Sequence, residues 1–311
     1  MENMNKSKAV NIFFPILIVS YIGMSFVIAF ITQVAGIVLP MWMQYVVSQI
    51  FILIPALLYA LVCRKHFPRE LSYKPLKPID ALLSLLTGYA LIPMVLFIGN
   101  LSMLFATNHL QESADGLLQY PFVVQLIIVA VIPPMVEEFV FRGLFYHSYK
   151  EQGVFAGALM SGFIFGLFHL NINQFCYAVV MGVVFAYMVE ATGSMWSAII
   201  AHFAVNTYSI GMMAIARYLS NISTEFQGQY EQAQQAASQM STGAVISQLV
   251  TLAGTAACFM FFAILMIRKM AKRNNRLGNI TDRSGSIKKL ITIPVIITAL
   301  VCILYMVSIE M

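Results

Sequence analysis

Nine stretches of this 311-residue chain consist almost entirely of apolar residues and are long enough to cross a membrane. A helix needs about 20 such residues to span the hydrocarbon core of a bilayer. The chain is 60% hydrophobic and 10% charged, whereas soluble globular domains carry about 25% charged residues. These features predict an all-α fold, a polytopic transmembrane helix bundle of about 8–9 spans. The stretches are 10–32, 41–63, 81–106, 121–146, 153–170, 173–190, 194–216, 243–267 and 290–309.

The positions of the Lys and Arg residues predict the orientation of this bundle. With the N-terminus in the cytoplasm, nine spans place every Lys and Arg on the cytoplasmic side except Arg142, inside a span, and Arg217, alone on the outer side. Cytoplasmic loops of membrane proteins carry the excess of Lys and Arg. We therefore expect a cytoplasmic N-terminus and a multi-pass membrane protein, and the composition suggests a bacterial cell membrane. Contact with anionic lipid headgroups explains the basic segment 268–289, so no nucleic-acid partner is expected.

The distribution of polar residues divides the chain into three regions. Residues 1–120 form an N-terminal transmembrane region with few polar groups inside its spans. Residues 121–216 form a core of four spans that holds all the charge within the membrane. Residues 217–311 comprise an outer loop rich in Gln and Ala, compatible with a surface helix or with disorder, and two plain apolar spans. No internal repeat of the kind that builds many transporters is evident.

Six polar side chains of the core spans stand out as candidates for a functional site. Ionisable groups at bilayer depth cost at least a few kcal/mol, so they mark candidate functional sites. Asp80 and Glu190 lie at span ends and are interpreted as interfacial. The first two of the six are adjacent carboxylates, and the second of these shares a helix face with the arginine one turn later. The six are Glu137, Glu138, Arg142, His169, His202 and Asn206.

Helix geometry places these groups at similar depths. Spans four and five form a hairpin that turns at 150–153, so Glu137 lies about 21 Å and His169 about 27 Å from the turn. His202 lies about 12 Å and Asn206 about 18 Å into span seven. Glu137 points about 100° away from its neighbouring carboxylate and is free to face another helix. We therefore expect three helices to share one polar site.

The helices near this site carry two further signals. Pro133 and Pro134 cannot donate backbone hydrogen bonds, so the carbonyls of Val129 and Ala130 lose their helical partners. Non-helical backbone at this depth is tolerated beside protein or a water-filled cavity. The segment 162–166 begins and ends with Gly, and small residues four apart allow helices to approach closely. A hydrated pocket beside a kinked helix is the expected result.

Three motifs of this core carry a family resemblance. Glu137-Glu138-Phe-Val-Phe-Arg142 fits EExxxR, Phe165-Gly-Leu-Phe-His169 fits FxxxH, and His202-Phe-Ala-Val-Asn206 fits HxxxN. In this order and on separate spans, they resemble the CAAX protease and bacteriocin-processing family of intramembrane proteases, also called the Abi family. That family includes the type II CAAX prenyl endopeptidases. The resemblance covers about residues 121–210, and no motif position departs from the pattern.

The resemblance implies an intramembrane endopeptidase that hydrolyses a peptide bond of a membrane-associated or lipidated protein or peptide. By analogy, Glu137 activates water with the help of His169. His202 and Asn206 stabilise the oxyanion of the tetrahedral intermediate. Glu138 and Arg142 support the helix and the base.

A zinc mechanism would use some of the same atoms. Two His and one Glu form a common catalytic Zn²⁺ site with an open position for water, here Glu137, His169 and His202. As a ligand Glu137 would no longer be a free base, and Glu138 is engaged by Arg142. Metal-free hydrolysis that requires no cofactor is therefore preferred, with Zn²⁺ as the alternative. Two other functions stay open: a proton-coupled membrane transporter, and a non-catalytic bacteriocin-immunity or scaffold protein.

Overall fold

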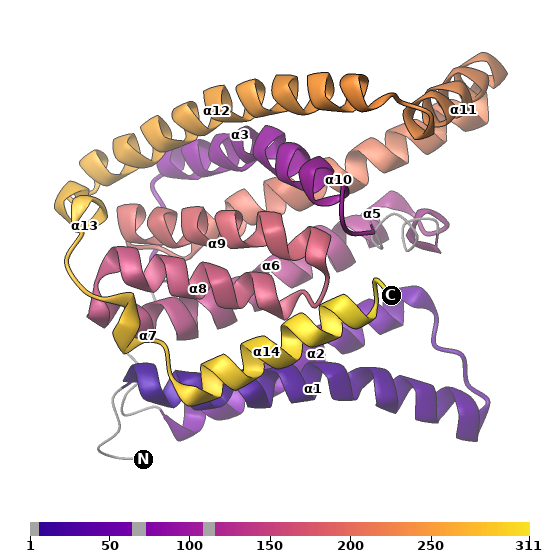
Figure 1. Ribbon diagram of the computed structural model, residues 1–311. Coiled ribbons are helices and arrows are strands. Elements are labelled where there is room, and N and C mark those ends of the chain that lie inside the picture. The colour runs from indigo at the N-terminus through magenta and orange to yellow at the C-terminus, as the bar shows by residue number, and fades with distance from the viewer. Residues whose placement is uncertain (1–5, 64–72, 108–115) are drawn as a thin grey trace.

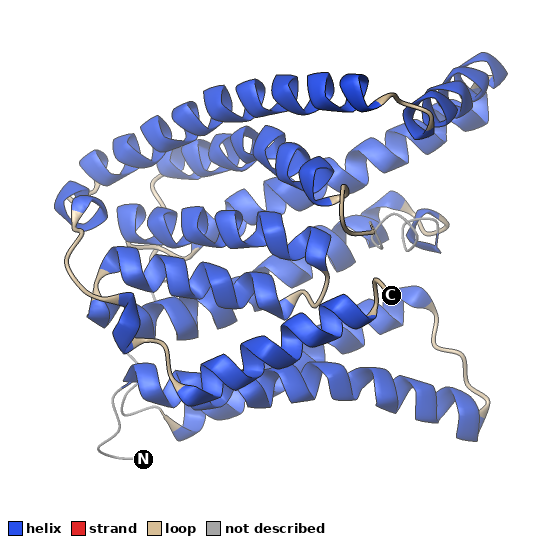
Figure 2. Cartoon of the chain, in the orientation of Figure 1, coloured by secondary structure: helices blue, strands red, loops and turns tan. Residues whose placement is uncertain are grey.

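The computed structural model describes residues 6–63, 73–107 and 116–311, and its regular elements in these ranges are all helical (Figures 1 and 2). Arg64, Lys65 and Arg69 of the expected cytoplasmic loop lie outside the described residues. Within the described ranges, seven helical segments are long and apolar enough to cross a membrane, and two shorter apolar helices accompany them. The expected polytopic helical bundle is therefore confirmed, with a multi-pass membrane location.

The nine apolar helical segments correspond to the nine expected spans. Six of the long ones are continuous helices: α1 (Lys6–Ala35), α2 (Met41–Val62), α3 (Pro78–Ser102), α9 (Ile172–Thr192), α10 (Trp196–Ile222) and α12 (Thr242–Arg273). The two shorter helices are α8 (Val154–Phe168) and α14 (Ile293–Ser308). The division of the chain into three regions stays a prediction.

The seventh long segment, Phe122–Gln152, changes its helical type several times along its length. Two stretches of π-helix, in which hydrogen bonds join residues five apart, interrupt it. These irregularities lie on both sides of the adjacent carboxylates. Its parts are α5 (Phe122–Gln125), π-helix η1 (Leu126–Val131), α6 (Ile132–Glu138), π-helix η2 (Phe139–Tyr146), α7 (His147–Tyr149) and 3₁₀-helix η3 (Lys150–Gln152).

Three further helical elements lie outside the expected spans. The Gln- and Ala-rich outer loop contains α11 (Thr224–Ser238). Of the two expected states of this loop, a surface helix or disorder, the structure therefore has the helix. On the other side of the molecule, α13 (Leu277–Thr281) and the 3₁₀-helix η4 (Ile287–Lys289) follow the end of α12. They lie within the basic segment, which therefore has its own local structure.

The helices stack in layers around the interrupted segment. In Figure 1, α12 and α3 lie at one side, α9 and α8 in the middle, and α14, α1 and α2 at the other. The closest pairings are α12 with α3, α8 with α9, and α10 with α3. One hydrophobic cluster joins the α1 side to α8, and a second joins α3, α9, α10 and α12. The catalytic candidates lie between these two clusters.

The outer surfaces of the bundle are apolar. Phe26 of α1, Val250 of α12 and Ile293 of α14 are 72%, 67% and 72% exposed. Such large exposed apolar faces are not expected of a soluble monomer, whereas lipid tails cover them without cost. Their distribution over the peripheral helices agrees with a bundle surrounded by bilayer.

The hairpin between spans four and five turns where the sequence predicted. Gly153 has φ +107°, and a Cβ atom there would lie 2.0 Å from the carbonyl oxygen of Ser284, so this turn requires glycine. In the following helix, a Cβ on Gly162 would lie 2.7 Å from the carbonyl oxygen of Val179 in α9. The predicted close packing at the glycines of 162–166 is confirmed, and it holds α8 against α9.

Candidate active site

At the break in the fourth span, a side chain from another helix supplies the hydrogen bond that the backbone lacks. Pro133 and Pro134 occupy the first turn of α6, directly after the π-helix η1. The carbonyl oxygen of Val129, which lacks its helical donor because residue 133 is proline, accepts a hydrogen bond from Nδ2 of Asn206 at 2.9 Å. Asn206 therefore joins α10 to the irregular segment. This contact gives the expected kink a specific partner.

Glu138, Arg142 and His202 form a buried charged network. Oε1 of Glu138 accepts hydrogen bonds from Nη1 of Arg142 at 3.0 Å and from Nδ1 of His202 at 2.9 Å. The three residues are at most 4% exposed. An unpaired charge at such a position costs several kcal/mol, so the members of the network depend on one another. The Glu138–Arg142 pair was expected from the sequence, whereas the bond to His202 was not.

Two phenylalanines enclose the network. The guanidinium carbon of Arg142 lies 4.4 Å from the ring centroid of Phe165 and 5.2 Å from that of Phe185. The Phe185 ring also stacks on the imidazole of His202, with centroids 5.3 Å apart. Cations over aromatic faces gain about 0.5–2 kcal/mol, more when water is excluded. Phe185 lies outside the three motifs, and nothing in the sequence distinguishes it from the other phenylalanines of the spans.

Glu137 turns away from this network toward a cavity. Its Oε2 lies 3.9 Å from Nε2 of His202, on the side of the imidazole opposite Glu138. Among the described residues, the basic group within 4.0 Å of the Glu137 carboxylate is the imidazole of His202. The residue is 9% exposed and lines the cavity. The expectation that Glu137 is left free to face another helix is confirmed.

His169 lies at the end of α8. The helix ends at Phe168, and Nδ1 of His169 lies 2.8 Å from the carbonyl oxygen of Phe165. A carbonyl only accepts, so Nδ1 carries the hydrogen and Nε2 is the acceptor in the neutral ring. Leu170 then takes a left-handed conformation, φ +51°, and Asn171 caps the N-terminus of α9 by accepting from the backbone N–H of Gln174 at 2.9 Å. His169 is thus fixed at a sharp reversal of the chain.

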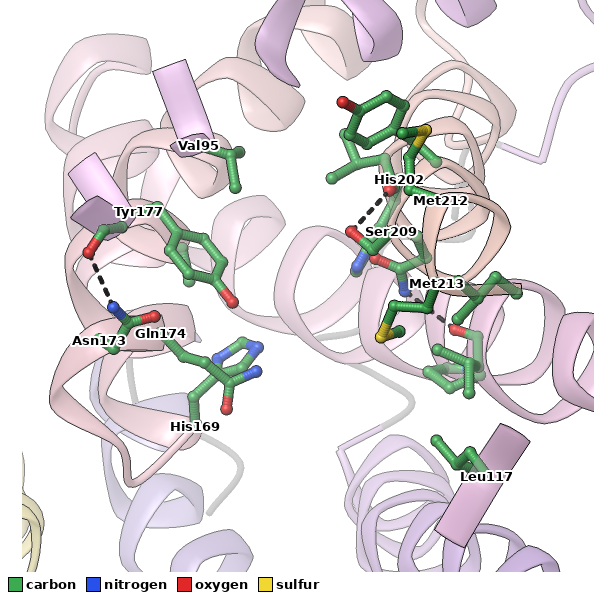
Figure 3. A pocket seen from close by; sticks show the side chains of 18 of the residues that line it. Val95, Leu117, His169, Asn173, Gln174, Tyr177, His202, Ser209, Met212 and Met213 are labelled. Atoms are coloured by element: carbon green, nitrogen blue, oxygen red, sulfur yellow. Dashed lines mark hydrogen bonds between the residues drawn. The ribbon is translucent and has the colours of Figure 1, made fainter. Parts of the chain in front are cut away.

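A cavity of about 1180 Å³ connects the four catalytic candidates. Glu137, His169, His202 and Asn206 all line it, so their expected convergence on one site is confirmed. Figure 3 shows His169, Gln174 and Tyr177 on one side and Ser209, Met212 and Met213 on the other. No hydrogen bond or ion pair joins His169 to Glu137 or His202 among the described residues, so His169 faces them across the cavity. The individual roles of the four residues stay predictions.

The two carboxylates interpreted as interfacial are buried. Asp80 is 1% exposed and accepts from Arg273 at 2.9 Å, and Glu190 is 3% exposed and accepts from Arg276 at 2.6 Å. Glu190 also accepts from the hydroxyl of Tyr146 at 3.1 Å. Both residues lie near helix ends, so their interfacial position stays a prediction, but their burial under the basic segment, which folds back onto the bundle, was not expected from the sequence. The two arginine pairs attach the basic segment to α3 and α9, and the Tyr146 hydroxyl joins Glu190 to the helical segment that carries Glu137.

Zinc binding by Glu137, His169 and His202 would require their donor atoms to lie close to one another. No three His, Cys, Asp or Glu side chains of the described ranges are grouped so that they could hold one metal ion. Glu137, His169 and His202 line the same cavity, but only Glu137 and His202 approach each other closely. In this arrangement the three residues do not fit a metal centre.

Comparisons with known proteins agree with the motif analysis. Residues 119–208 match the family described as type II CAAX prenyl endopeptidase Rce1-like. The chain is also 28% identical over 128 residues to a Bacillus subtilis protein named "Putative membrane peptidase YdiL", covering 40% of this chain and 52% of the relative. The chain thus spans about half the length of this relative. No solved structure matches. The resemblance to the CAAX protease and bacteriocin-processing family is confirmed over the region that carries the catalytic candidates.

Proposed function

We propose that this chain, whose residues 119–208 match the type II CAAX endopeptidases, is an intramembrane endopeptidase that hydrolyses a peptide bond of a membrane-associated or lipidated peptide. One observation carries the proposal: the carboxylate of Glu137 faces a cavity within 3.9 Å of Nε2 of His202, while His202 is fixed from behind by Glu138. A free carboxylate, an oriented imidazole and a cavity are what general-base hydrolysis requires.

In the proposed first step, Glu137 takes a proton from a water molecule. Hydrogen bonds of about 2.8 Å to both Glu137 and His202 fit within the 3.9 Å between Oε2 and Nε2. The oxygen of that water attacks the carbonyl carbon of the substrate, and the carbonyl oxygen becomes an oxyanion. Glu137 then gives the proton to the amide nitrogen, the C–N bond breaks, and a carboxylic acid and an amine leave.

The oxyanion would be stabilised from α10. Nδ1 of His202 bonds to Glu138, so Nε2 is the ring nitrogen left to face the cavity, where it would donate to the oxyanion whenever it carries a hydrogen. One hydrogen of the Asn206 amide is used by Val129, and the second is available to the cavity. A single oxyanion donor is worth about 10²–10³ in rate.

Glu137→Gln in proteoliposomes containing a library of membrane-anchored peptides tests this function. The amide has the same shape but cannot accept the proton, so cleavage measured by mass spectrometry is expected to fall at least about 10²-fold. Glu225→Gln, the same exchange at an exposed position of α11, serves as the matched control and is expected to cleave like the wild type. Wild-type activity in Glu137→Gln would refute the proposal, and a wild-type protein that cleaves nothing would favour transport or a non-catalytic role.

A further inference from the structure

The cavity continues well beyond the catalytic candidates along one face of α10. Its lining includes His202, Asn206, Ser209, Met213 and Arg217, which follow one another at intervals of three or four residues. This is the spacing of a single helix face. The separation of 15 positions between His202 and Arg217 corresponds to about 22 Å along the helix axis. The cavity, called the channel below, therefore extends at least about 22 Å along α10.

The two charged side chains of this channel lie far apart along α10. Among the described lining residues, Glu137 and Arg217 are the only members of the Asp, Glu, Lys and Arg types. Glu137 lies at the catalytic end, and Arg217 lies near the C-terminus of α10. Arg217 is exposed, and it forms no hydrogen bond or ion pair with any part of the chain that the structure describes. A cation with no internal partner is available to a ligand.

The wall of the channel carries amide groups that suit a peptide backbone. Gln49 of α2 is 8% exposed and lines the channel, and its Oε1 has no hydrogen-bond partner in the described structure. A buried acceptor without a partner is destabilising, so a donor from a ligand is favoured there. Gln174 and Asn221, on other elements, supply further side-chain amides to the same lining. Such groups both donate and accept, as the peptide bonds of an extended substrate require.

We propose that Arg217 binds a carboxylate of the peptide substrate and thereby sets the distance from that carboxylate to the cleaved bond. The guanidinium group forms two parallel hydrogen bonds with a carboxylate, a geometry that lysine does not reproduce. An extended peptide rises about 3.3 Å per residue, so about 22 Å corresponds to six or seven residues. This inference rests on the proposed endopeptidase function and adds a substrate class: an acidic group, at the C-terminus or on a Glu side chain, six or seven residues from the scissile bond.

Paired peptide libraries test the inference. N-terminally myristoylated peptides of random sequence are prepared with a free C-terminal carboxylate or with a carboxamide, and a third set carries the carboxamide and a Glu near its end. We expect the wild type to prefer the acid-terminated set over the amidated set by about threefold to tenfold, a typical contribution of an exposed charge pair. The products should peak at C-terminal fragments of six or seven residues. The third set distinguishes a side-chain carboxylate from a terminal one.

Variants of Arg217 test whether this residue causes the preference for acid-terminated peptides. In Arg217→Gln the acid-to-amide ratio should fall to about one, and Arg217→Lys should keep part of it. Lys288→Gln, which removes an exposed cation outside the channel, should keep the wild-type ratio. An equal preference in the wild type and in Arg217→Gln would overturn the inference.

Binding to the Glu137→Gln protein separates this inference from the proposed function. If the wild type cleaves no peptide, the affinities of Glu137→Gln for acid-terminated and amidated peptides still decide the question. The inference predicts tighter binding of the acid, lost in the Glu137→Gln/Arg217→Gln double variant. Equal affinities in both proteins would contradict it.

Discussion

Neutralising Glu138 is expected to destabilise the protein far more than the loss of one surface charge would. Glu138→Gln keeps the shape of the side chain but leaves Arg142, 1% exposed, without a carboxylate partner. Breaking a buried ion pair by removing one partner costs about 3–5 kcal/mol. At about 2 °C per kcal/mol for a chain of this size, the melting temperature is expected to fall by about 6–10 °C.

A second substitution separates stability from catalysis. In Glu138→Gln/Arg142→Met the buried cation is also gone, and replacing both members of a buried pair with uncharged groups is often close to neutral. We therefore expect the double variant to regain most of the lost melting temperature. Its activity is not expected to return, because His202 still lacks the carboxylate that accepts from Nδ1. In other hydrolases a carboxylate that orients a histidine is worth up to about 10⁴ in rate.

The assay combines thermal unfolding in detergent micelles with initial cleavage rates in proteoliposomes. The single variant Arg142→Met completes the comparison. If the double variant loses as much melting temperature as Glu138→Gln and Arg142→Met lose together, Glu138 and Arg142 stabilise the fold independently, and the predicted coupling between them is wrong. Recovery of activity together with stability would show that the bond from His202 to Glu138 has no part in the reaction.

Three further outcomes follow from the packing and the donor geometry. Gly162→Ala is expected to lower the free energy of unfolding by about 1–3 kcal/mol, since its Cβ would lie 2.7 Å from the Val179 carbonyl oxygen. Gly211→Ala, whose Cβ would have no neighbour within 4 Å, should leave the melting temperature unchanged or raised. Equal effects of the two substitutions would contradict the close contact at Gly162. Asn206→Leu should lower kcat by at least about 10²-fold because both the Val129 contact and the oxyanion donor are lost, and a change confined to KM would count against this role. Treatment with a zinc chelator should leave cleavage unchanged, and loss of cleavage that added Zn²⁺ restores would overturn the metal-free mechanism.

Much of the architecture could be predicted from the sequence because the bilayer imposes it. Apolar runs of fixed length become helices, since every backbone group must be satisfied within the hydrocarbon region. The hairpin at Gly153 and the break at Pro133 follow from the local conformational limits of these residue types. The shared depth of Glu137 and His202 follows from helical rise alone.

The missing details depend on how the helices rotate against one another. The bond from His202 to Glu138 requires a particular rotation of α10 against α6, which no periodicity specifies. Phe185 acquires its place between Arg142 and His202 for the same reason. Glu190 is buried because the basic segment after α12 folds back over it, and this long-range contact cannot be predicted from the residues around Glu190.

Chemical rescue of Glu137→Ala tests whether Glu137 acts as a base in a cavity that small solutes can enter. Cleavage by this variant is expected to fall at least about 10²-fold and to recover in part when formate, which replaces the missing carboxylate, is added. Formamide, which has a similar size but no basic oxygen, should not restore it. A Glu137→Ala protein that cleaves at the wild-type rate, or that formamide restores as well as formate does, would contradict the account.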